Sequence, residues 1–252
     1  MTQIASVHSF RRGVGKTTVA ANMAAIGVQH GLRVGVMDLN LAAPSLHILF
    51  GLNEAQMGFT LNDFVWGNCS IAEAVYEVEG LGGNGRLFLI PASTEARAIG
   101  RILRGGYYVN FLADACHSLT EQLALDVLLL DTYAGLGEEV QLAMALADVV
   151  VTVMRPDVRD YVGTRTILEL GQRLGVSTLA LVVNEVPKLY EMTAVQTEVE
   201  RGFGCAVTAV LPHLDEIMML GSAGLFVNEY EAHEKTAEFE KLFQQLSVYN
   251  KP

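Results

Sequence analysis

The residues best suited to chemistry lie in one short stretch near the start of the chain. It reads Ser9-Phe10-Arg11-Arg12-Gly13-Val14-Gly15-Lys16-Thr17-Thr18. In a glycine-rich turn that opens a helix, successive backbone N–H groups and the positive helix end all point at an anion. The Gly-X-Gly-Lys-Thr core adds a lysine for the β- and γ-phosphates, Lys16, and a hydroxyl for Mg²⁺, Thr17. The stretch therefore predicts a nucleotide phosphate site.

The expected phosphate contacts extend over the whole second half of this loop. They come from Arg12, Gly13, Val14, Gly15, Lys16, Thr17 and Thr18. One position departs from the common phosphate-loop pattern, because its first glycine, six residues before Lys16, is Phe10 here. A chance match in a surface turn is the alternative, but the flanking segments favour the phosphate loop, since a strand pattern precedes it and a helix pattern follows.

A second Mg²⁺ ligand is expected at Asp131. This residue ends an apolar run, Val127-Leu128-Leu129-Leu130, with the strongest strand pattern in the chain. In phosphate-loop enzymes an acid at such a strand end supports the metal. The alternative is that Asp131 only caps a turn.

Short apolar runs alternate with helical patterns along the chain, which is typical of a mostly parallel sheet with helices on both faces. We therefore predict an α/β fold in one phosphate-loop domain spanning residues 1–252. Strands are expected at residues 4–8, 34–38, 87–92, 127–131, 149–154, 179–184 and 206–211. Helices are expected from residue 19 to Gly31 and at 107–125, 161–174 and 192–201, with short helices or turns at 46–52 and 71–78.

In such a sheet, ligands bind at the carboxyl ends of the strands. The residues just past the predicted strands are the glycine loop, Asp38, Asp131, Arg155 with Asp157, Asn184 and Pro212. A phosphate cradle, two acids and an amide at one edge suit a Mg²⁺–nucleotide.

Composition limits the remaining possibilities. The net charge is −11, with 17 Lys+Arg against 28 Asp+Glu, so general attraction to nucleic acid or anionic lipid is not expected. The three cysteines are far apart and include no Cys-X-X-Cys, which favours a reducing cytoplasm and argues against a metal cluster within one chain. No signal peptide or membrane span is recognisable.

Several motifs in the expected order resemble the MinD/ParA ATPases. The loop from Arg11 to Thr18 is similar to their deviant phosphate loop, Lys-Gly-Gly-Val-Gly-Lys-Thr-Thr. Residues 131–137, Asp-Thr-Tyr-Ala-Gly-Leu-Gly, resemble their second switch, and 89–93, Leu-Ile-Pro-Ala-Ser, resemble a MinD segment. The resemblance implies ATP and Mg²⁺ as cofactors, Asn184 as a reader of the purine, and Pro212 beside the base. It also implies an ATP-dependent homodimer in which a signature lysine reaches the partner's phosphates.

Three positions depart from this family pattern. Arg11 stands in place of the signature lysine, and arginine keeps the charge and can clamp phosphate oxygens. Arg12 replaces a glycine and could reshape the loop. In the first switch, Asp38-Leu39-Asn40 has an amide where the family has a second aspartate. Asn40 can orient water but cannot accept its proton, so we expect slow ATP hydrolysis, unless orientation suffices or another group supplies the carboxylate.

The resemblance suggests two further kinds of partner, a membrane and DNA. MinD proteins usually end in a basic amphipathic helix that enters membranes. Here the last helical stretch has an apolar face with Phe239, Leu242, Phe243 and Leu246 and an acidic opposite face, so it is expected to dock on the core. ParA proteins bind DNA nonspecifically through basic side chains. The candidates are Arg97, Arg101 and Arg104, and Arg155, Arg159, Arg165 and Arg173, with pairing to nearby acids as the alternative.

Three functions are compatible with these observations. The first is an ATP switch that positions a division site, replicon, appendage or other cargo, with a regulatory or cargo protein as its partner. The second is a non-hydrolysing scaffold that uses nucleotide only to hold its dimer. The third is an Mrp-type iron–sulfur carrier, which residues 38–52 also resemble but which needs paired cysteines at a dimer interface.

Overall fold

Eight strands pair into one sheet in the computed structural model, which describes residues 2–105 and 110–246. The order across the sheet is β3-β4-β2-β5-β1-β6-β7-β8. The strands are β1 (Gln3–His8), β2 (Arg33–Asp38), β3 (Tyr76–Val78), β4 (Arg86–Ile90), β5 (Val127–Asp131), β6 (Val149–Met154), β7 (Thr178–Val186) and β8 (Val207–Pro212). All neighbouring pairs are parallel except β3 with β4, which confirms the predicted mostly parallel α/β sheet.

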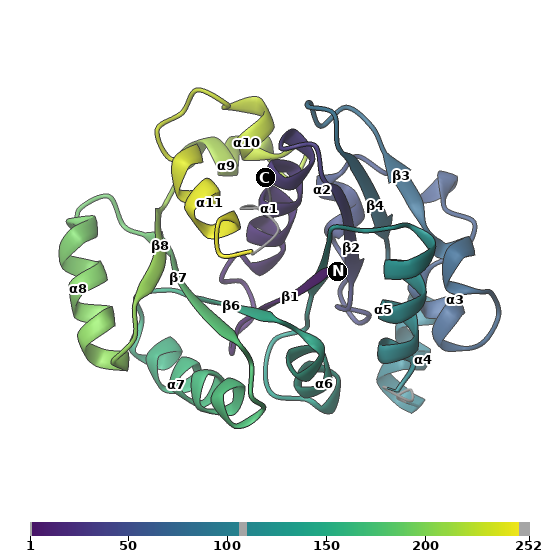
Figure 1. The fold of residues 1–252 in the computed structure, drawn as a ribbon, viewed down its shortest axis with the longest axis horizontal. Helices are drawn as coiled ribbons and strands as arrows, with labels where there is room; N and C mark the ends of the chain where they lie inside the picture. Colours follow the sequence, from purple (N-terminus) through teal and green to yellow (C-terminus); the bar gives the residue numbers. More distant parts are fainter. Residues whose placement is uncertain (1, 106–109, 247–252) are drawn as a thin grey trace.

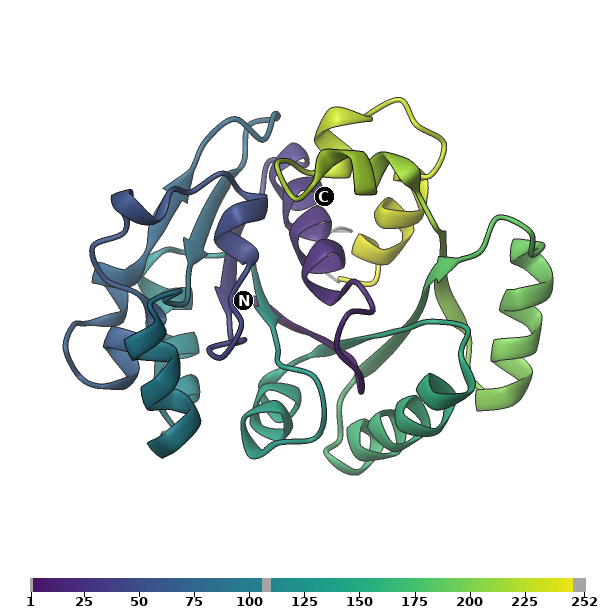
Figure 2. The same cartoon turned by 180° about the vertical axis from the view of Figure 1, so that it is seen from behind.

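Helices cover both faces of the sheet, and their connections set the position of the site (Figures 1 and 2). On one face α1, α10 and α11 pack on the sheet, and α5, α6, α7 and α8 pack on the other. The helices are α1 (Lys16–Gln29), α2 (Leu46–Leu49), α3 (Leu61–Val65), α4 (Ala96–Gly105), α5 (Phe111–Gln122), α6 (Glu138–Leu146), α7 (Val158–Arg173), α8 (Met192–Phe203), α9 (Asp215–Leu220), α10 (Phe226–Glu229) and α11 (Thr236–Phe243). Two 3₁₀ turns, η1 (Glu54–Gln56) and η2 (Ile71–Ala74), complete the elements.

The central strands are apolar along their length because both of their faces are covered. Every residue of β5 and β6 is buried, and in β1 and β2 nearly all are. Register pairs Asp38 at the end of β2 with Asp131 at the end of β5. The carboxyl ends of β1, β2 and β5 therefore meet at one point of the sheet edge, as the strand pattern predicts.

Four expectations about the elements need correction. Residues 76–78, expected in a short helix or turn, form the edge strand β3. This strand has only three residues and is partly exposed, so the sequence shows no clear strand pattern there. Helix α6, which follows the second switch, was not predicted, and neither were α9 and α10. Helix α7 begins three residues before the expected start, because the Asp157 side chain accepts the Arg159 N–H and caps it. Pro212 is the last residue of β8 rather than the residue after it. Part of the helix expected at 107–125 lies outside the described residues, and the described part is α5.

The apolar face of the last helix docks on the core, as predicted. Phe239, Leu242, Phe243 and Leu246 are all buried, in the same cluster as α1. The approach to α1 is close, because a Cβ built on Gly27 would lie 3.0 Å from Cζ of Phe243. Among the residues that the structure describes, no helix is long and apolar enough to cross a membrane.

Shortening Phe243 tests this docking. We expect Phe243→Ala to lower the free energy of unfolding by about 3–5 kcal/mol, because it leaves a cavity between α11 and α1. The measurement is urea denaturation. Leu103→Ala, at a side chain that is 69% exposed, is the control and should change the free energy by less than about 0.5 kcal/mol. An unchanged midpoint for Phe243→Ala would show that α11 does not depend on this contact.

Candidate functional site

The glycine loop connects β1 to α1 at the carboxyl edge of the sheet. Gly13 and Gly15 have φ angles of +74° and +91°, which side-chain-bearing residues rarely adopt. Helix α1 begins at Lys16, and the Val19 N–H bonds to the Gly15 carbonyl at 2.9 Å. This is the geometry in which a helix start and its preceding turn present N–H groups to an anion.

A buried charged cluster lies under the loop. It consists of Lys16, Asp131 and Asp38, with Thr17 Oγ1 donating to Asp131 Oδ2 at 2.7 Å. Burial lowers the pKa of Lys16, while the charges of Asp131 and Asp38 oppose that shift. Burial raises the pKa of Asp131, and the Thr17 hydrogen bond and the Lys16 charge oppose it. The sequence predicted Lys16, Thr17 and Asp131 for one site, and the structure brings them together.

This cluster fits a divalent cation bound with a nucleotide. Oδ1 of Asp131 is buried and has no hydrogen-bond partner within the described residues. Its neighbour Asp38 adds a second carboxylate, and the hydroxyl of Thr17 adds another hard oxygen. Oxygen donors of this kind suit Mg²⁺, which usually takes one or two carboxylates together with substrate phosphates.

The first switch folds back on Asp38. Its carboxylate accepts the backbone N–H groups of Asn40 at 3.0 Å and of Ser45 and Leu46 at 3.2 Å. Burial is the main reason that its pKa is raised, the charge of Asp131 adds to the shift, and these three hydrogen bonds oppose it. The Asn40 amide nitrogen donates to the Ala43 carbonyl at 2.6 Å, and Oδ1 of Asn40 is buried without a partner in the described structure. The free group of Asn40 is thus an acceptor.

The purine side of the site is narrow in this conformation. Asn184 Nδ2 donates to the Val14 carbonyl at 2.8 Å, directly beside Gly15. Asn184, Pro212 and Thr18 line a cavity of about 40 Å³ that continues to Phe239 and α9. That space holds about one water molecule. The predicted base-binding residues therefore surround one cavity, which must widen to admit a purine.

The three bulky residues at the start of the loop each contact a distant segment. The Phe10 ring lies over Gly163 in α7, where a Cβ would come within 2.0 Å of it. The Arg12 guanidinium lies 4.4 Å from the ring centroid of Tyr133 in the second switch. Arg12 and Tyr133 stand where the resemblance has glycine and proline, so these two departures form one cation–π contact. Sequence reasoning missed Tyr133, although its departure from the switch pattern was the available signal.

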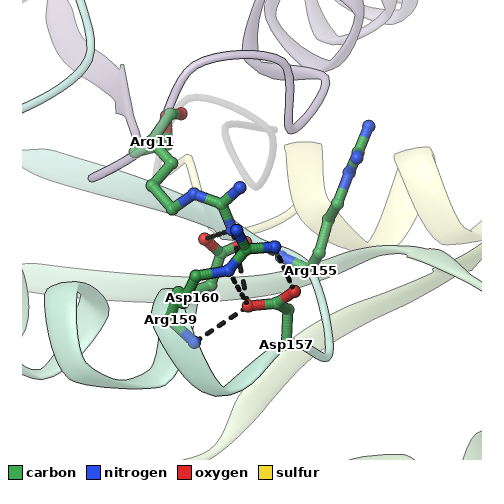
Figure 3. A network of polar contacts seen from close by, with 6 residues as sticks. Arg11, Arg155, Asp157, Arg159 and Asp160 are labelled. Carbon is green, nitrogen blue, oxygen red and sulfur yellow. Dashed lines mark hydrogen bonds and ion pairs between the residues drawn. The ribbon is translucent and has the colours of Figure 1, made fainter.

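Arg11 is held by acids of its own chain (Figure 3). Its Nη1 lies 2.9 Å from Oδ1 of Asp160 and 3.4 Å from Oδ1 of Asp157, both in the N-terminal turn of α7. The Asp160 side chain is only 3% exposed and also accepts the Arg155 N–H. Asp160 is a second residue that sequence reasoning did not connect with the loop. Arg11 was expected to reach a partner's phosphates. In this structure it forms an ion pair with Asp160 of its own chain.

The second group of candidate DNA-binding arginines is largely engaged within the chain. Arg155 pairs with Glu185 at 2.9 Å, Arg159 pairs with Asp157 at 3.1 Å, and Arg165 donates to the Gly202 carbonyl. For Arg155 and Arg159 the alternative of pairing with nearby acids is the one that the structure confirms. No ion pair joins Arg97, Arg101 or Arg104 to any acid within the described ranges, 2–105 and 110–246.

The parallel sheet, with a glycine loop between β1 and α1 and acids at the ends of β2 and β5, defines a P-loop NTPase fold. A family model described as ParA, NUBPL iron-transfer P-loop NTPase, matches residues 1–247. The chain belongs to this family of MinD/ParA ATPases, as the motifs predicted.

Relatives and solved structures agree with this assignment. An uncharacterized ATP-binding protein of Methanocaldococcus jannaschii is 29% identical over 181 residues, which cover 72% of this chain and 63% of that protein. The septum site-determining protein MinD of Thermotoga maritima is 23% identical over 98% of this chain and 88% of its own. The structure of MinD from Pyrococcus horikoshii complexed with Mg-ADP superposes with a TM-score of 0.82 at 21% identity, covering 98% of this chain and 96% of that one. That likeness establishes the fold.

Gly15 offers a direct test of the loop geometry. A Cβ at Gly15 would lie 2.2 Å from Asn184 Nδ2, so we expect Gly15→Ala to weaken ATP binding by about tenfold or more, through this clash and the strained φ. Isothermal titration calorimetry with Mg²⁺ and ATP measures it. Gly31→Ala is the matched control, because Gly31 has a similar φ of +80° but no atom within 4 Å. Equal affinities for the two variants would contradict the assigned role of Gly15.

Proposed function

We propose that the protein is an ATP-dependent switch that dimerises when ATP is bound and acts in the spatial positioning of a cargo or a cellular site. The observation that carries this proposal is the cluster of Lys16, Thr17 and Asp131 at the start of α1, where one buried oxygen of Asp131 has no partner. In this proposal the loop N–H groups and Lys16 bind the phosphates, and Thr17 and Asp131 hold Mg²⁺. When bound, Mg²⁺ neutralises phosphate charge.

Slow hydrolysis is the second part of the proposal. A carboxylate in the first switch can both orient the attacking water and accept its proton, whereas an amide can only orient it. The Asn40 nitrogen is already bonded to Ala43, which leaves the buried Oδ1 as the side-chain atom that can still accept a hydrogen bond. The protein would therefore keep ATP for longer than a relative with aspartate at this position.

Replacing the amide by a carboxylate tests this part. We expect Asn40→Asp to raise the steady-state rate of ATP hydrolysis by about tenfold or more, because it restores a proton acceptor next to the water. Phosphate release with Mg²⁺ and ATP measures the rate. Asn53→Asp makes the same chemical change at an exposed cap of η1 and should leave the rate unaltered. If Asn40→Asp and the wild type turn over equally fast, Asn40 does not limit hydrolysis.

Dimerisation through Arg11 is the third part. Arg11 is 33% exposed and lies at the open side of the loop, so it can leave Asp160 for a stronger phosphate ligand. In the proposed dimer it contacts the phosphates bound by the partner subunit, as the resemblance implies for the signature lysine. The ion pair with Asp160 would then be present only when Arg11 is not bound across the interface.

The mass of the protein with and without ATP tests this role. Arg11→Ala is expected to abolish ATP-dependent dimerisation in light-scattering measurements, and Arg11→Lys to preserve most of it, because the positive charge is kept. Arg159→Ala is the control, since Arg159 also pairs with Asp157 but is 73% exposed and outside the loop. Thermal denaturation of each variant separates a dimerisation defect from the loss of the Asp160 ion pair. An Arg11→Ala protein that still dimerises with ATP would show that another residue makes the contact.

Two other functions are distinguished by the same measurements. A non-hydrolysing scaffold would dimerise with ATP but release no phosphate, even after Asn40→Asp. Iron transfer appears in the description of the family model. Within the described residues no group of three His, Cys, Asp or Glu side chains could hold a metal ion, so a carrier would need ligands from two subunits. Iron bound to the dimer after anaerobic reconstitution would favour that alternative.

A further inference from the structure

A groove of about 870 Å³ is lined by residues of α3, α4 and the segments beside them. Both helices lie on the β3–β4 side of the sheet (Figure 1). It is separate from the nucleotide cavity, whose lining comes from the loop, β7, β8, α9 and α11. Its volume is in the range of ligand-binding clefts. One wall is α4, with Arg97, Arg101 and Arg104, and the opposite side is formed by η1, α3 and the residues around them.

The three arginines form a continuous basic row. Their spacing of four and three residues places them on one face of α4, and the row spans about 10 Å at 1.5 Å per residue. All three are exposed, and none is paired with an acid within the part of the chain that the structure describes. Four arginines elsewhere in the chain, Arg11, Arg86, Arg155 and Arg159, do have acidic partners.

Two side chains in the groove lining are held in place by contacts within the chain. The Arg101 guanidinium stacks 4.2 Å from the ring centroid of Trp66, which fixes its plane. Asn62, in the lining, is fully buried; its Oδ1 accepts the Ser93 N–H at 2.7 Å, and its amide nitrogen has no partner within the described residues. A buried amide without a partner is costly, so a ligand that accepts its hydrogen bond would be favoured.

We propose that this groove binds an acidic peptide segment of a partner protein. The row of guanidinium groups is longer than one phosphate or carboxylate can contact, so the ligand is a linear polyanion. The lining also holds carboxylates, which offer only acceptors: Glu54 and Asp63 on the side of η1 and α3, and Glu95 just before α4. A peptide supplies backbone N–H donors to these carboxylates, which the phosphates of DNA cannot do. The chemistry of both walls together therefore favours an acidic peptide.

This inference deepens the proposed function by naming the chemistry of the regulatory or cargo partner. The groove lining includes Ser93, Thr94 and Glu95, which follow β4, and β4 pairs with β2, the strand that ends at Asp38. Peptide binding itself is measured without nucleotide. A failure of the ATP-switch proposal and a failure of the groove proposal are therefore distinguishable.

Trp66 allows a direct measurement, because it is the only tryptophan of the chain and lines the groove. We expect hexaglutamate to change the fluorescence of the full chain in a saturable way that weakens with added salt. Hexalysine, a short DNA duplex and inorganic phosphate are titrated in parallel. At concentrations at which hexaglutamate saturates the protein, none of the other three ligands should show saturable binding.

Removing the three arginine charges of α4 tests whether this wall of the groove binds the peptide. Replacing Arg97, Arg101 and Arg104 by glutamine should weaken hexaglutamate binding by at least about tenfold, measured by the anisotropy of labelled peptide, because three charge-assisted contacts are lost. The matched control replaces Arg173, Arg201 and Lys241 by glutamine. These residues are exposed on α7, α8 and α11, and their loss changes the net charge equally, so the affinity should match the wild type.

Four results would overturn the proposal. They are the absence of saturable hexaglutamate binding, an equal affinity of the groove variant and the wild type, an equal loss in the control variant, and displacement of hexaglutamate by DNA or by inorganic phosphate at matched charge concentration. Displacement by DNA would assign the groove to nucleic acid, and displacement by phosphate would assign it to small anions.

Discussion

Two carboxylates buried side by side set the electrostatics of this molecule. The parallel register of β2 and β5 places Asp38 next to Asp131, and burial raises the pKa of both. A buried pair of like charges must be compensated, and the surrounding chain does so. Three backbone N–H groups of the first switch bind Asp38, while Thr17 and Lys16 from α1 face Asp131. The need to compensate this carboxylate pair thus brings the loop, the first switch and β5 together. It leaves Oδ1 of Asp131 without a partner in the described residues.

The first half of the loop is held by side chains rather than shaped by glycine. Phe10 packs on Gly163, Arg11 pairs with Asp160, and Arg12 stacks on Tyr133. The first two contacts tie the loop to α7 and the third ties it to the second switch. Glycine would leave this segment free to sample more backbone conformations, so the bulky residues restrict it before any ligand binds. In the proposed nucleotide complex, conformational adjustment of the loop would therefore come mainly from its second half, around Gly13 and Gly15.

The sheet and the composition of the site followed from the sequence, because both depend on local patterns. Fully buried strands are apolar throughout, and the candidate ligand residues lie near their carboxyl ends, as Asp131 does at the last position of β5 and Asn184 does near the end of β7. The strand β3 escaped prediction because three half-exposed residues carry no pattern. The contact between Arg11 and Asp160 joins positions 149 residues apart, so it depends on how α7 packs beside the loop. The groove beside Trp66 likewise exists only because α3 and α4 are brought together by the fold.

In the described conformation, several groups assigned to nucleotide already have partners in the protein. Asn184 donates to the Val14 carbonyl, Arg11 pairs with Asp160, and the base cavity has room for about one water. Under the proposed assignment, nucleotide binding would be an exchange of partners, and a ligand shifts such an equilibrium only by its differential affinity. Releasing Arg11 leaves the Asp160 side chain, which is 3% exposed, with the Arg155 N–H as its remaining partner within the described residues, so the contact to phosphate would have to offset that cost. A reversible switch of the proposed kind therefore requires that the contacts to nucleotide and the contacts within the chain be of similar strength.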